Sequence, residues 1–135
     1  MMNRGFTLGT DRLEATTPAP HFINPHCFGE DFAKWMQAEL KKRLVSASDP
    51  IQKDFGWVLH VPHQEHVFTL TIEMVDESIG SVSDEWWIDI SFEKPLNGFR
   101  AWFRKPPQAA LGGLATIVET ILASEPRFQK FASVA

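Results

Sequence analysis

A two-residue alternation of apolar side chains, repeated four times, constrains the fold more than any other feature of this sequence. The four stretches are FGWVLHV (55–61), HVFTLTIEM (66–74), WWIDISFE (86–93) and FRAWFR (99–104). Successive side chains of a β-strand point to opposite faces, so the alternation predicts four strands that share one apolar face. Because the connections between them are short, we expect an antiparallel meander.

Two amphipathic helices flank these strands in the sequence. Phe32, Met36 and Leu40 recur every four residues and predict a helix over residues 30–45. A second apolar stripe predicts a helix from residue 107 to residue 124, with proline tolerated in its first turn. Since each helix has one apolar stripe, we expect both on the apolar face of the sheet, which makes a two-layer α+β sandwich.

The length of 135 residues and the hydrophobic content of 44% fit one globular domain, which we place at residues 20–135. We expect an extended linker at Thr16, Thr17, Pro18 and Pro20, since proline biases the preceding residue away from helix. Residues 1–19 are therefore expected to be poorly ordered, or loosely docked through Phe6 and Leu8.

Charge and composition restrict the cellular compartment and the classes of partner that we expect for this protein. A net charge of -4 disfavours a surface that attracts nucleic acid or anionic lipid. The single Cys27 cannot form an intramolecular disulfide, and no stretch approaches the roughly 18 apolar residues of a membrane span. We expect a cytoplasmic protein without a membrane association.

The stretch HVPHQEH holds three of the five histidines, at positions 60, 63 and 66. If Leu59 and Phe68 both face the core, the shortest loops put Val61 opposite His66, and His60 opposite Val67. His60 and His66 then point to opposite faces. Zinc needs converging ligands, so His60, His63 and His66 are not expected to form a metal site, and no cofactor is expected.

The same register argument defines the outward face of the sheet. A PLNG loop sets Glu93 opposite Arg100, Ser91 opposite Trp102, and Asp89 opposite Arg104. Across the preceding hairpin, Glu73 is expected near Trp87, and Thr71 near Asp89. The candidate binding residues of this face are Trp87, Trp102, Arg100, Arg104, Glu73, Asp89 and Glu93.

Tryptophan and arginine are enriched at binding hot spots, so this face predicts a non-catalytic domain that binds a protein partner or another copy of itself. Alternatively, the N-terminal segment folds back over the tryptophans. A hydrolase or metal enzyme would use His60, Cys27 and nearby carboxylates as acid, base or ligands. Single-stranded nucleic acid would also use exposed aromatics, but the acidic residues on this face disfavour it.

DFGWVLHV followed by WWIDISFEK resembles small bacterial proteins of unknown function that have an acidic residue, then Gly-Trp, at the start of a strand. The resemblance covers about residues 30–104 and implies no particular activity. In size and acidity the chain is also similar to immunity proteins, which neutralise bacterial toxins.

Overall fold

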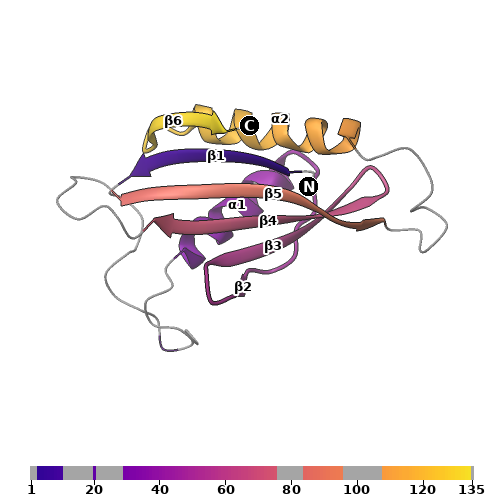
Figure 1. The fold of residues 1–135 in the computed structure, drawn as a ribbon, viewed down its shortest axis with the longest axis horizontal. Helices are drawn as coiled ribbons and strands as arrows, with labels where there is room; N and C mark the ends of the chain where they lie inside the picture. The colour runs from indigo at the N-terminus through magenta and orange to yellow at the C-terminus, as the bar shows by residue number, and fades with distance from the viewer. Residues whose placement is uncertain (1–2, 11–19, 21–28, 76–83, 96–107, 135) are drawn as a thin grey trace.

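The computed structural model describes residues 3–10, 20, 29–75, 84–95 and 108–134 (Figure 1). Its elements, in chain order, are β1 (Asn3–Thr10), α1 (Glu30–Lys42), β2 (Ile51–Gln52), β3 (Trp57–His63), β4 (His66–Val75), β5 (Asp84–Pro95), α2 (Gln108–Ser124) and β6 (Gln129–Val134). The strands form one six-stranded antiparallel sheet in the order β2-β3-β4-β5-β1-β6. The protein is therefore α+β with two helices, as predicted, but the predicted number of four strands is wrong.

The largest correction concerns the N-terminal residues. β1 pairs with β5 on one side and with β6 on the other, so Asn3–Thr10 form an internal strand of the sheet (Figure 1). Phe6 and Leu8 are 1% and 2% exposed, which makes them core residues rather than loose anchors. Residues 1–2 and 11–19, the rest of the expected loose segment, lie outside the described residues.

β1 also changes the neighbours of β5. Asn3 lies opposite Ser91 and Gly5 lies opposite Asp89, and β4 occupies the other side of β5 at both positions. The predicted register, with Ser91 opposite Trp102 and Asp89 opposite Arg104, is therefore not the pairing of β5. The predicted strand 99–104 itself lies outside the described residues.

The two hairpins that the structure does describe follow the predicted parity. Glu73 lies opposite Trp87 and Thr71 lies opposite Asp89, as predicted. In the β3–β4 hairpin the loop is shorter than expected, because Gln64 and Glu65 both adopt positive φ, 47° and 67°, in a two-residue turn. The ladder is consequently shifted by two residues, with His63 opposite His66.

Helix α1 ends three residues before the predicted end at Val45. The backbone N–H of Val45 donates to the carbonyl of Leu40 and that of Leu44 donates to Lys41, which is the hydrogen-bond pattern of a Schellman motif. Leu44 takes the left-handed position of this motif with φ 63°. The chain turns there toward β2, so Leu44, which continues the four-residue spacing of Phe32, Met36 and Leu40, is 95% exposed.

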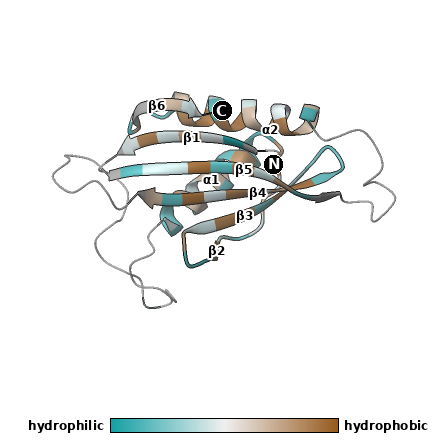
Figure 2. Cartoon of the chain, viewed as in Figure 1, coloured by the Kyte–Doolittle hydropathy of each residue, from teal (hydrophilic) through white to brown (hydrophobic). Residues whose placement is uncertain are grey.

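Buried side chains of the strands and of both helices form one core cluster, and hydrophobic residues, brown in Figure 2, recur along these elements. Phe32 of α1 is fully buried, with ring centroids 5.4 Å from Trp86 of β5 and 5.2 Å from Phe128. Helix α2 contributes seven buried residues: Ala110, Leu111, Leu114, Ala115, Val118, Ile121 and Leu122. In the described part of the chain, neither helix combines the length and the apolarity needed to cross a bilayer.

If β1 is an integral strand, shortening Phe6 will unfold the protein much more readily than a change on the opposite side of the same strand. We expect Phe6→Ala to lower the free energy of unfolding by about 3–5 kcal/mol, as for other buried phenylalanines. Urea denaturation of the full chain measures this value. Thr7→Ala is the matched control and should cost under about 1 kcal/mol; equal effects would contradict the placement of β1.

Candidate functional site on the outer sheet face

We call the strand residues that point away from the core the outer face. Their neighbours in the sequence, such as Leu59, Ile72 and Ile88, are fully buried in the core. The outer face includes Val58, His60, Pro62, Val67, Thr69, Thr71, Glu73, Glu85, Trp87, Asp89, Ser91, Glu93, Gly5 and Thr7. Val58, Val67 and Thr71 are buried at 3%, 7% and 8% exposure although they belong to this face, so part of it is covered.

Trp87 is the exposed aromatic residue of the described outer face. The residue is 38% exposed, whereas its neighbour Trp86, which points into the core, is fully buried. Trp87 lies opposite Glu73 of β4 and opposite Thr7 of β1. Its indole atoms Cζ2 and Nε1 come within 3.6 Å of the position that a Cβ on Gly5 would occupy. The glycine thus lets the indole pack onto the backbone of β1.

Three carboxylates stand around this indole. Glu85 and Asp89 are two residues before and after Trp87 on β5, so they share its face, and Glu73 lies directly opposite. Burial raises the pKa of the Glu73 carboxyl above its usual range, and the nearby charge of Asp89 raises the pKa further. Within the described residues, Glu73 has neither a hydrogen bond nor an ion pair to offset its charge.

Glu93 reaches a different part of the outer face because β5 contains a β-bulge. Phe68 pairs with Phe92 and Val67 pairs with Lys94, so Glu93 is an extra residue between two regular pairs. Its Oε1 accepts a hydrogen bond of 2.9 Å from Thr69 Oγ1. A bulge of this kind redirects a side chain, and here it aims the carboxylate across β4 toward β3.

On β3 the carboxylate meets His60. Oε1 of Glu93 lies 2.7 Å from Nδ1 of His60, which is hydrogen-bond length. The ring N–H does not align with that oxygen, however, so the pair is a short contact and not an aligned hydrogen bond.

The backbone of His60 is held by Ser48, in the segment between α1 and β2. The His60 N–H donates to Ser48 Oγ, and the Ser48 N–H donates to the His60 carbonyl, each at 2.9 Å. Beside them is a shallow depression of about 680 Å³, lined by Ser46, Ala47, Ser48, His60, Pro62, Val67 and Glu93. Nδ1 of His60 is buried while 36% of the side chain is exposed, so the exposed part of the ring is the part that carries Nε2.

The other two histidines of the hairpin, His63 and His66, lie on its core side. Nδ1 of His66 is 2.7 Å from the carbonyl oxygen of Gln64, and its ring packs against Phe92 at 5.8 Å. Nε2 of His63 is buried, has no hydrogen-bond partner in the described part of the chain, and lies 3.5 Å from where a Cβ on Gly113 of α2 would be. The three imidazoles do not converge, and the described residues contain no group of three potential metal ligands.

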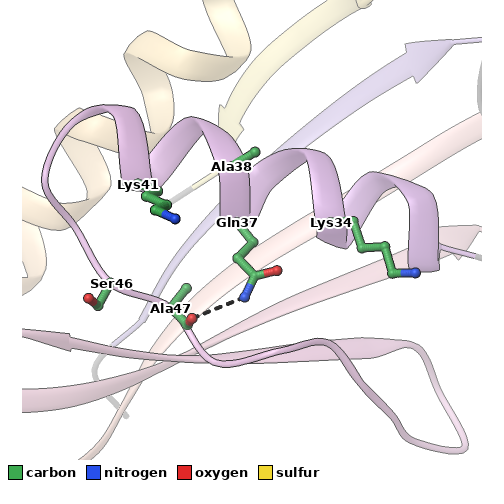
Figure 3. A pocket seen from close by; sticks show the side chains of 6 residues that line it. All are labelled: Lys34, Gln37, Ala38, Lys41, Ser46 and Ala47. Carbon is green, nitrogen blue, oxygen red and sulfur yellow. Dashed lines mark hydrogen bonds between the residues drawn. The ribbon is translucent and has the colours of Figure 1, made fainter.

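A second hollow of about 440 Å³ lies between α1 and the segment after it, lined by Lys34, Gln37, Ala38, Lys41, Ser46 and Ala47 (Figure 3). Gln37 points across it, and its Nε2 donates to the carbonyls of Ala47 and Ser48 at 3.2 and 3.1 Å. This side chain fastens the segment to the helix. Lys34 is 3.8 Å from Glu30 in an ion pair along the helix, so the hollow holds a structural contact and no convergent acid–base groups.

The structure thus places part of the predicted site. Trp87, Glu73 and Asp89 lie together on the outer face, and Glu93 lies apart from them, beside His60. Trp102, Arg100, Arg104 and Cys27 are outside the described residues. Sequence reasoning missed Gly5 and Thr7, although the alternation of Gly5, Thr7 and Gly9 with Phe6 and Leu8 was a usable strand signal.

Comparisons of the chain with protein-family models, with curated protein sequences and with solved structures gave no match.

His63 makes the stability of the protein depend on pH. Burial lowers the pKa of its imidazole below the usual 6.5, so the unfolded chain takes up a proton at a higher pH than the folded chain does. The contribution of His63 to the free energy of unfolding will therefore fall as the pH drops below about 6.5, and level off below the folded-state pKa. Urea denaturation at several pH values measures this decrease, which should be smaller in His63→Gln than in the unchanged protein. An unchanged pH dependence in that variant would contradict the assignment.

Proposed function

We propose that this protein is a non-catalytic binding domain that contacts a protein partner through the outer face, with Trp87 at the centre of the contact. The observation that carries the proposal is the contrast between two adjacent tryptophans, one fully buried and one 38% exposed. Trp86 contributes to the core, whereas part of Trp87 remains in water. A large rigid aromatic side chain gives contact area at little cost in conformational entropy.

The arrangement of the helices supports an accessible outer face. Phe32 of α1 contacts Trp86, and Gly113 of α2 faces His63, and both strand residues point to the core side of the sheet. In Figure 1, α1 passes behind β3, β4 and β5. We therefore propose the two-layer arrangement expected from the sequence, with both helices on the core side and the surroundings of Trp87 open to a partner.

The charges around Trp87 favour a protein over a nucleic acid. Glu73, Glu85 and Asp89 share the outer face with the indole, and carboxylates repel the phosphates of a single strand. A protein surface can present groups that match these carboxylates.

Replacing Trp87 will separate binding from stability. We expect Trp87→Ala to weaken binding of a partner isolated from the native host by at least tenfold, because exposed interface tryptophans are frequent hot spots. The same change should lower the free energy of unfolding by less than a change in the core does, since Trp87 is 38% exposed. Ile88→Ala, the matched core variant, should cost about 2–5 kcal/mol of stability. Calorimetric affinity and urea denaturation measure the two effects. If Trp87→Ala unfolds the chain as readily as Ile88→Ala, the side chain belongs to the core and the proposal fails.

The contact between His60 and Glu93 favours a second candidate function, a hydrolase that uses His60 as a general base. A carboxylate beside Nδ1 orients an imidazole and stabilises its protonated form, while Nε2 lies on the exposed part of the ring beside the depression. Ser48 fixes the backbone under the imidazole, and the bulge brings the carboxylate to it.

This candidate predicts that the chain hydrolyses an activated ester such as p-nitrophenyl acetate, and that His60→Gln lowers the rate by about 100-fold, a usual share for one general base. Release of p-nitrophenol measures the rate, and His66→Gln is the control because His66 lies on the other face. Equal rates in the two variants would remove the hydrolase candidate.

A further inference from the structure

We propose that the partner of the outer face is a basic protein segment, one arginine of which stacks on Trp87 and pairs with Glu73. This inference rests on the proposed binding function and adds the chemistry of the partner. It is carried by the position of one exposed indole among three carboxylates.

The indole is placed to receive a planar cation. Trp87 packs onto Gly5 on the side of β1, which limits the orientations that the ring can take. Since the residue is 38% exposed, part of it remains open to solvent. A guanidinium group binds the face of an indole through the ring quadrupole, at about 0.5–1 kcal/mol in exposed sites and more when water is excluded.

Glu73 supplies the matching charge. It lies directly opposite Trp87 across the β4–β5 ladder, so a cation over the indole comes within reach of its carboxylate. Glu73 is half-buried and has no hydrogen bond or ion pair among the described residues. Burial and the nearby charge of Asp89 both disfavour the ionised carboxyl of Glu73 and so raise its pKa. A bound cation would relieve this cost.

The described residues that border the indole contain no positive charge. They are Gly5, Thr7, Glu73, Glu85 and Asp89, so the patch is acidic in a chain whose net charge is -4. An acidic partner would be repelled here. Arginine suits the patch better than lysine because its planar group can stack on the ring while its N–H donors reach a carboxylate.

The test uses the blocked peptide Ac-Arg4-amide as a probe of the full-length protein labelled with ¹⁵N. The resonance of the Trp87 indole N–H is followed as the peptide is added, and the neutral isostere Ac-citrulline4-amide serves as the matched peptide. We expect the arginine peptide to shift this resonance at a concentration about fivefold lower than the citrulline peptide does. Glu73→Gln should weaken the arginine peptide about fivefold, whereas Glu119→Gln, an exposed carboxyl on α2, should not.

Several outcomes would overturn the inference. Equal affinity for the two peptides, or no effect of Glu73→Gln, would show that the site does not select for a cation. A stronger shift with oligo-dT would assign the patch to nucleic acid, and a shift that depends only on protein concentration would assign it to a second copy of the chain. If the host partner still requires Trp87 in any of these cases, the proposed binding function stands; if Trp87→Ala leaves that partner bound, the binding function itself fails.

Discussion

The pairing of β1 between β5 and β6 is the interaction on which the rest of this structure depends. It buries Phe6 and Leu8 in the core from one side of a single strand. From the other side, it brings Gly5 and Thr7 next to Trp87. It also joins the last strand of the chain, β6, to the sheet through ladder hydrogen bonds and the stacked rings of Phe6 and Phe131, whose centroids are 5.8 Å apart. The core and the candidate binding surface therefore rest on the same eight residues.

The sequence predicted the elements whose periodicity is strong. Both helices and the strands β3, β4 and β5 have long apolar patterns, and the pairs Glu73–Trp87 and Thr71–Asp89 follow from parity alone. The sequence did not predict β1 because its outer positions are glycine and threonine, which leave only two large apolar residues in eight. Its pairing with β5 and β6 joins segments that are far apart in the chain, and no local pattern specifies such a partner.

The site was predicted less completely because it depends on departures from regular geometry. The bulge that directs Glu93 toward His60 is a feature of the pairing of β4 with β5, and the sequence pattern does not reveal it. Regular strand alternation therefore set Glu93 opposite Arg100 instead. The exact loop of the β3–β4 hairpin also required non-glycine residues at positive φ, which the sequence does not favour. The outward direction of Trp87, by contrast, needed only the alternation.

The central claim is that Trp87 is held at the surface as a contact residue while its sequence neighbours Trp86 and Ile88 are buried. The most direct measurement is ¹⁹F NMR of the protein labelled with 5-fluorotryptophan, with a neutral gadolinium chelate in the solvent. The account predicts strong relaxation enhancement for Trp87 and weak enhancement for Trp57 and Trp86, which are 3% and 0% exposed. A Trp87 resonance as well protected as that of Trp86 in the isolated chain would contradict it.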